Sequence, residues 1–128
     1  MNFFEKMCHC GSLVSFSDCC EPFLSGNKNA PSAEKLMRSR YCAYVIQNAD
    51  YLMETTHSST QKYHSKKDIL EWSKSNNWLK LEIVFSTENT VEFKAYFLNN
   101  NLQANVHHEK STFKLENKKW FYVDGKFY

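Results

Sequence analysis

The sequence predicts an α+β domain, in which three helices pack on a strongly curved antiparallel sheet of four strands, with a small cysteine-rich segment at its N-terminus. Over residues 32–77 the apolar residues recur at helical spacing, and from Trp78 onward they alternate with polar residues. Four of the five cysteines fall between Cys8 and Cys20. Helices followed by consecutive strands form separate layers, unlike the alternating elements of parallel α/β folds.

Composition excludes several classes of protein. The chain has 128 residues, enough for one domain with a core and a small appendage. Aromatic residues make up 16%, which indicates an interior rich in rings. A net charge of +2 argues against a protein that mainly binds nucleic acid. No apolar run approaches the roughly 18 residues of a membrane span, and residues 1–6 do not resemble a signal peptide, so we expect a cytoplasmic protein.

The chain is expected to divide into three parts. Residues 1–24 form the cysteine-rich segment, residues 25–31 a linker, and residues 32–128 the α+β domain. Phe3 and Phe4, near the start, are expected to lay their rings on the main domain. The linker is predicted because glycine, asparagine and proline, the residues typical of turns, gather before residue 32.

Capping residues indicate where the three predicted helices begin. Ser32 is expected to cap a helix that runs to about residue 48. Asp50 is expected to cap a short second helix over residues 51–56, and Ser65 opens a third that ends near residue 76.

The alternation of apolar and polar residues predicts four strands. Leu79 to Phe85 and Val91 to Leu98 have apolar residues at every second position. Residues 103–115 and 119–123 form the third and fourth strands, joined by a polar turn. Long strands joined by short turns predict a strongly twisted antiparallel sheet.

The cysteines have the spacing of a metal site. Cys8 and Cys10 form a C-x-C pair, and eight residues later Cys19 and Cys20 are adjacent. Four thiolates satisfy the tetrahedral coordination that zinc takes in structural sites, with no position left for a catalytic water. We therefore expect structural Zn²⁺ held by Cys8, Cys10, Cys19 and Cys20, with His9 pointing to solvent.

The cysteine spacing also allows interpretations other than a zinc site. A disulfide framework requires an oxidising compartment, and a disulfide between the adjacent Cys19 and Cys20 would strain the peptide between them. The C-x-x-C spacing of redox enzymes is absent. Redox chemistry of another kind, or a thiol cluster without metal, remains the alternative to zinc.

Several motifs resemble a known family. Cys-x-Cys-Gly-Ser followed by Cys-Cys resembles the SEC-C motif, a zinc-binding knuckle found at the C-terminus of the SecA translocase. Residues 36–44 (LMRSRYCAY), together with Glu109-Lys110-Ser111-x-Phe113 and the final WFYVDG, resemble the YchJ-like family. This resemblance implies a nuclear-transport-factor-2-like (NTF2-like) domain after the knuckle, cone-shaped and with an interior pocket. The biochemical role of the family is poorly defined.

Two functions from different classes follow as expectations. In the first, the knuckle presents His9, Ser15, Phe16 and Lys28 to a protein partner, and the likeness to SecA suggests a partner of the export-chaperone or ribosome kind. In the second, the cone binds a small molecule or acts as a weak hydrolase or isomerase with His57 or Asp50 as general base. The pocket candidates are Arg38, Arg40, Tyr41, Tyr44, Asp50, His57, Glu109, Trp120 and Tyr122.

Two further expectations concern the assembly and the fifth cysteine. Homodimerisation through the open face of the sheet is plausible for the broad fold, although that face has a mixed composition. Cys42, in the first helix, is expected to be a small core residue.

Overall fold

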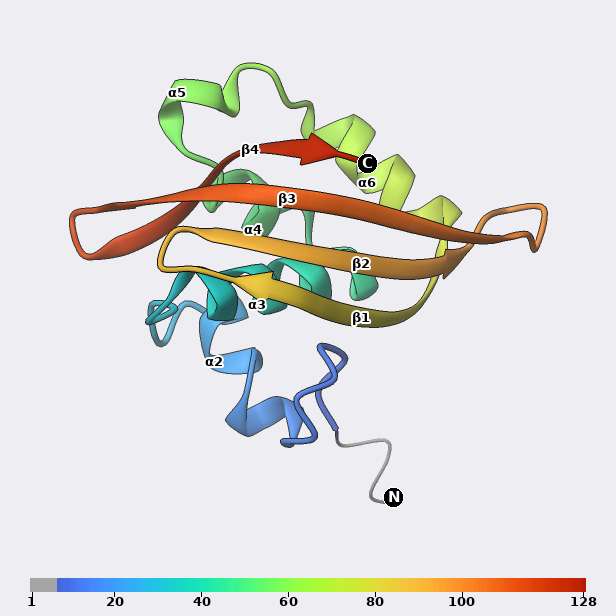
Figure 1. Ribbon diagram of the computed structural model, residues 1–128, viewed down its shortest axis with the longest axis horizontal. Helices are drawn as coiled ribbons and strands as arrows, with labels where there is room; N and C mark the ends of the chain where they lie inside the picture. Colours follow the sequence, from blue (N-terminus) through green and yellow to red (C-terminus); the bar gives the residue numbers. More distant parts are fainter. Residues whose placement is uncertain (1–6) are drawn as a thin grey trace.

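The computed structural model describes residues 7–128, and residues 1–6, including the predicted contact of Phe3 and Phe4, lie outside the described part. The fold is α+β, with a single antiparallel sheet in the order β1-β2-β3-β4. In Figure 1 the helix α3 (Ala33–Val45) lies behind the sheet, and the cysteine-rich segment lies below α3 and the strand β1 (Asn77–Ser86). In the described residues no helix is long and apolar enough to cross a membrane.

The four strands follow the predicted alternation. They are β1 (Asn77–Ser86), β2 (Thr90–Leu98), β3 (Ala104–Glu116) and β4 (Lys119–Phe127). Every second residue of β2 from Val91 to Ala95 is buried, as expected for a strand with one face on the core. Register shifts interrupt β1 twice and the β3–β4 pairing once. Such bulges increase the local twist, which is consistent with the curled sheet.

The three predicted helices correspond to α3 (Ala33–Val45), α4 (Ala49–Glu54) and α6 (Lys66–Ser75). Ser32 caps α3 by accepting a hydrogen bond from the Lys35 amide, and Ser65 caps α6 in the same way. The predicted cap of α4 is wrong. Asn48 accepts from the Tyr51 amide at 3.1 Å, whereas Asp50 lies inside the first turn and pairs with Lys66.

Three short helical pieces were not predicted from the sequence. They are the 3₁₀ turn η1 (Phe16–Asp18), α2 (Glu21–Leu24) and α5 (Ser58–Gln61). Each is only three or four residues long, too short for a helical period to be visible. The first two shape the cysteine-rich segment, and α5 lies beside β4.

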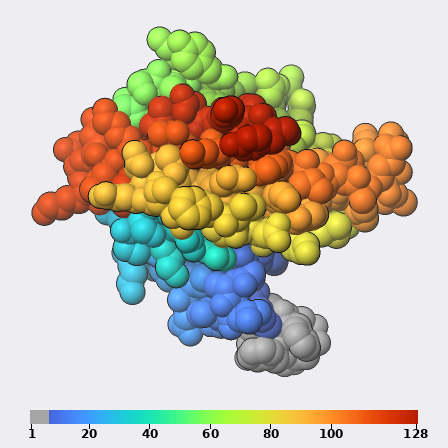
Figure 2. All heavy atoms as spheres, in the orientation of Figure 1, coloured from blue at the N-terminus to red at the C-terminus, as the bar shows by residue number. Residues whose placement is uncertain are grey.

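A single hydrophobic core connects the cysteine-rich segment, the helices and the sheet. Leu52 and Val91 are fully enclosed, and Phe93 and Leu36 are nearly so. The four N-terminal cysteines belong to the same cluster. In Figure 2 the cysteine-rich segment projects from one side of the body, so its buried side is the one that faces α3.

Polar side chains of neighbouring strands contact one another on the outer face of the sheet. The Tyr96 hydroxyl donates to Glu82 at 3.1 Å, and His108 pairs with Glu92 at 2.8 Å. Dimerisation through this face stays a prediction.

Candidate functional site

The local backbone brings the four cysteines together. A short antiparallel bridge between Met7 and Ser15 closes the turn that carries Cys8 and Cys10. Gly11, with a φ of +83°, makes this turn possible, because residues with a Cβ rarely adopt that conformation. The 3₁₀ turn η1 then delivers Cys19, and Cys20 is the residue before α2.

The sulfur positions fit a tetrahedral metal. The Sγ atoms of Cys8, Cys10, Cys19 and Cys20 all lie within 4.8 Å of one another. A metal with four bonds to sulfur of 2.3 Å would hold its ligands about 3.8 Å apart, the edge of that tetrahedron. Cys10 and Cys19 are 3.7 Å apart, and Cys19 and Cys20 are 3.9 Å apart. All five cysteines are free thiols, so no disulfide competes for these sulfurs.

The electrostatics of the cluster favour a thiolate at Cys10. Its pKa is lowered because the thiols of Cys20, Cys42 and Cys8 donate hydrogen bonds to its sulfur. The pKa of Cys20 is raised for the complementary reason, since it is a donor to Cys10. Thiols in such a cluster lose their protons to solvent when their sulfurs bind a metal cation.

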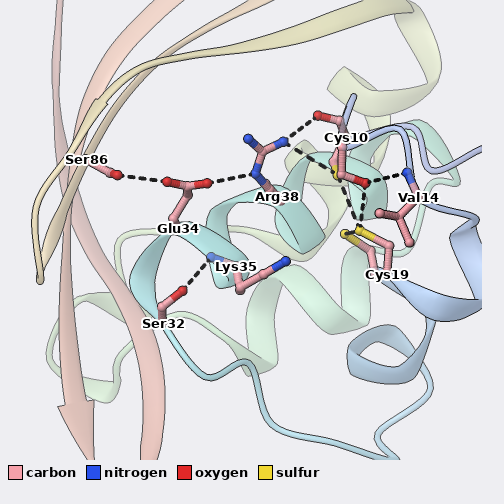
Figure 3. Close-up of polar contacts among 10 residues, drawn as sticks. Cys10, Val14, Cys19, Ser32, Glu34, Lys35, Arg38 and Ser86 are labelled. Carbon is pink, nitrogen blue, oxygen red and sulfur yellow. Dashed lines mark hydrogen bonds and ion pairs between the residues drawn. The ribbon is translucent and has the colours of Figure 1, made fainter.

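A chain of polar contacts fixes the cluster to the domain (Figure 3). Arg38 Nη1 donates to the Cys10 carbonyl at 2.9 Å and lies 3.7 Å from its Sγ. Arg38 Nε pairs with Glu34, and Glu34 accepts from Ser86 of β1 at 2.8 Å. The guanidinium thus supplies positive charge beside the site, where four thiolates around a divalent cation would leave a net charge near −2.

The cluster is buried by its own domain. Cys10 and Cys20 are 0% and 1% exposed, and the Sγ of Cys42 on α3 lies 3.5 Å from that of Cys8. His9 is exposed, in agreement with its predicted orientation, and its ring lies 5.7 Å from that of Phe16. The tip of the turn presents Leu13, 73% exposed, to solvent.

A second site is a cavity of about 300 Å³ between α3, α6 and the inner face of the sheet. We call it the aromatic cavity, because rings form most of its wall. Five of the predicted pocket residues line it: Arg40, Tyr41, Tyr44, Glu109 and Tyr122. The others that line it are Met37, His64, Ile69, Trp72, Trp78, Phe93, Ala95, His107, Ser111 and Phe127.

Two buried side chains of opposite charge, Arg40 and Glu109, line this cavity. Arg40 and Glu109 are 6% and 5% exposed. Burial would raise the pKa of Glu109, but hydrogen bonds from His107, Ser111 and Tyr122 outweigh it and lower the pKa. Arg40 keeps its charge despite burial, because guanidinium groups are not deprotonated in proteins.

Four predicted pocket residues lie elsewhere. Arg38 is two positions from Arg40, about 200° around the helix, and reaches the cysteine cluster instead. Asp50 and Trp120 line a separate cleft near α4.

His57, the fourth, also lies outside the aromatic cavity. The backbone of residues 55–57 pairs with Tyr122 of β4, which directs the imidazole to Glu116. Neither residue predicted as a general base, His57 or Asp50, therefore lines the aromatic cavity.

The sequence reasoning missed the aromatic wall. Trp72 of α6 and Trp78 of β1 were not among the predicted pocket residues, although both line the cavity and their ring centroids are 5.0 Å apart. His107 could have been found from strand parity, because it shares a face with Glu109 two residues on and lies 2.8 Å from it.

Gly125 offers a test of the buried carboxylate. A Cβ at this position would lie 2.0 Å from Glu109 Oε2. We expect Gly125→Ala to displace Glu109 from its donors and lower the free energy of unfolding by about 1–3 kcal/mol. Urea unfolding would measure this, with Asp124→Ala, an exposed neighbour, as the control. Equal stability of the two variants would contradict the described position of Glu109.

Comparison with known proteins places the chain in a family. A family model described as "YchJ, middle NTF2-like domain" matches residues 32–125. The UPF0225 protein plu2503 of Photorhabdus laumondii is 40% identical over 127 residues, covering 94% of this chain and 80% of that protein. The UPF0225 protein YchJ of Shigella dysenteriae is 39% identical, covering 94% and 83%.

Two solved structures are similar over nearly the whole chain. The solution structure of RPA3114, a SEC-C motif containing protein from Rhodopseudomonas palustris, has a TM-score of 0.86, 33% identity and coverage of 93% of this chain and 96% of that one. The crystal structure of a SEC-C motif containing protein from Psychrobacter arcticus has a TM-score of 0.81, 33% identity and coverage of 97% and 84%. This chain therefore belongs to the UPF0225, or YchJ-like, family, with an NTF2-like domain preceded by a SEC-C-type cysteine cluster.

Proposed function

We propose that this chain is a small-molecule-binding protein whose scaffold is held together by a structural zinc ion. The observation that carries the proposal is the aromatic cavity, in which a buried Arg40 and Glu109 border open space. Its volume of about 300 Å³ lies at the lower end of the range for ligand pockets, with apolar walls and few polar groups.

Stability alone does not account for this arrangement. Burying the charged groups of Arg40 and Glu109 costs desolvation free energy, and unfilled space beside them forfeits packing contacts. Aromatic side chains line this space but do not fill it, so there is room for a ligand. Because the cavity remains and a guanidinium borders it, binding is the function that best fits its composition.

The metal has a different role in this proposal. Four cysteine ligands leave no coordination position for a substrate or a water molecule, so zinc would bind without catalysing. The cysteines are buried against α3, and Arg38 joins them to β1 through Glu34. Zinc would therefore fasten the N-terminal segment to the domain.

A protein partner for the knuckle is the second candidate function. Leu13 and Val14 are 73% and 44% exposed at its tip, beside the exposed His9. These residues could meet a partner, whereas the cysteines themselves face inward. The burial of the cysteine side favours the fastening role as the main one.

The zinc proposal predicts a loss of metal and stability in Cys20→Ser. We expect one zinc per wild-type chain and less than about one tenth of that in the variant, with a loss of at least about 2 kcal/mol in the free energy of unfolding. Elemental analysis and urea unfolding would measure both. Cys42→Ala is the matched control and should keep its zinc, because Cys42 lies outside the set of four. A metal-free wild type that folds normally would refute the proposal.

The cavity proposal predicts opposite effects on stability and binding in Ala95→Leu. Ala95 is 4% exposed and lines the cavity, so a larger side chain fills empty space. We expect unchanged or higher thermal stability together with loss of binding, the pattern of a functional site that costs stability. Saturation-transfer NMR with single-ring aromatic compounds of each charge type would detect binding. Wild-type protein that binds none of them would contradict the proposed function.

A further inference from the structure

Some hydrogen-bond donors of the Arg40 guanidinium have no acceptor among residues 7–128. Its Nη1 donates to the Leu52 carbonyl at 3.0 Å and to Thr55 Oγ1 at 2.6 Å, which holds the end of α4. Its Nε and Nη2 have no acceptor among residues 7–128. Every fully buried side-chain nitrogen or oxygen in that range has a partner, so these two atoms retain accessible surface. Since Arg40 lines the aromatic cavity, its free donors are available to a ligand there.

The hydroxyl groups of two tyrosines are further donors without an acceptor in the described residues. Tyr41 and Tyr44 both line the cavity, and neither hydroxyl has a hydrogen-bond partner within the described residues. Burial raises the pKa of both phenols, so each keeps its proton at neutral pH and can donate. With Arg40, one face of α3 offers three donor groups to the cavity, because positions 40, 41 and 44 lie along the same side of a helix.

The acceptors in the cavity are already engaged. Glu109 Oε1 accepts from His107 Nε2 at 2.8 Å, and its Oε2 accepts from Ser111 at 2.6 Å and from Tyr122 at 3.0 Å. A cationic ligand would share the carboxylate with these three donors, which occupy three of its roughly four acceptor sites. A ligand that brings acceptors and negative charge does not compete with them, and it meets a guanidinium suited to bidentate pairing with a carboxylate.

The walls indicate the rest of the ligand. Trp72, Trp78 and Phe93 border the cavity, and the indole rings of the two tryptophans meet edge to face. Rings of this kind pack well against the edge or face of another ring. We propose that the aromatic cavity selects a small single-ring aromatic carboxylate, whose carboxylate binds Arg40 and the Tyr44 hydroxyl while its ring packs against Trp72, Trp78 and Phe93. This rests on the proposed function of ligand binding.

Three compounds of the same shape separate charge from hydrophobicity: benzoate, benzamide and benzylamine. The zinc-loaded full chain would be titrated with each at pH 7 and fixed ionic strength, with the indole N–H signals of Trp72 and Trp78 followed by NMR. We expect benzoate to bind about tenfold or more tightly than benzamide, since a hydrogen bond to a charged group is the stronger one. Benzylamine should bind more weakly still, because Arg40 repels it and the Glu109 carboxylate already accepts hydrogen bonds from three side chains.

The outcomes separate the two proposals. Binding of benzamide or benzylamine as tight as that of benzoate would overturn the carboxylate proposal and leave ligand binding intact. Failure of all three to shift the indole signals would overturn ligand binding by single-ring compounds as well.

A pair of matched variants tests the contact itself. Tyr44→Phe removes a hydroxyl that has no partner in the described fold, so folding should be unaffected while benzoate binds about tenfold more weakly. Tyr96→Phe is the control, because its hydroxyl lies on the outer face of the sheet and donates to Glu82. Its benzoate affinity should equal that of the wild type. Unchanged benzoate affinity in Tyr44→Phe would contradict the proposed contact.

Discussion

The contact between the cysteine cluster and α3 is the constraint on which both sites depend. Arg38 and Cys42 are one turn apart on this helix and meet Cys10 and Cys8. The opposite side of the same helix carries Arg40 and the other residues that line the cavity. A helix so placed has no free face, so whatever fixes its position on one side also sets the shape of the cavity on the other.

This arrangement would give a metal bound by the four cysteines a structural role that it would lack in a detached knuckle. The chain from Cys10 through Arg38 and Glu34 to Ser86 crosses from the N-terminal segment to the helix and then to β1. Each link is partly buried, where a hydrogen bond to a charged group contributes more than it would at the surface. Zinc at the end of this chain would order the segment, and the segment would in turn hold the helix.

Local patterns in the sequence predicted much of this fold. Strand parity and the caps at Ser32 and Ser65 depend on neighbouring residues, so they could be read directly. The cap of α4 was misassigned because Asn48 and Asp50 are both good capping residues, and only the backbone turn decides between them. The spacing of the cysteines identified the candidate metal site for the same reason, since its ligands come from thirteen consecutive residues.

The aromatic cavity could be predicted only in part, because its residues come from α3, α6 and all four strands. Composition suggested Arg40, Tyr44 and Glu109, but it could not separate Arg40 from Arg38, which differ only in their direction on the helix. His57 was placed wrongly because a backbone bridge to β4, a tertiary feature with no local signal, turns it toward Glu116.

We propose that a metal bound by the cysteine cluster holds α3 in place. Hydrogen exchange of the α3 amides, compared between zinc-loaded and chelator-treated protein, tests it most directly. If zinc fastens the helix, its removal should accelerate exchange along Ala33–Val45, including the amides of the residues that line the cavity. If exchange accelerates only in residues 8–20 and α3 remains protected, the cluster is an independent appendage and the account is wrong.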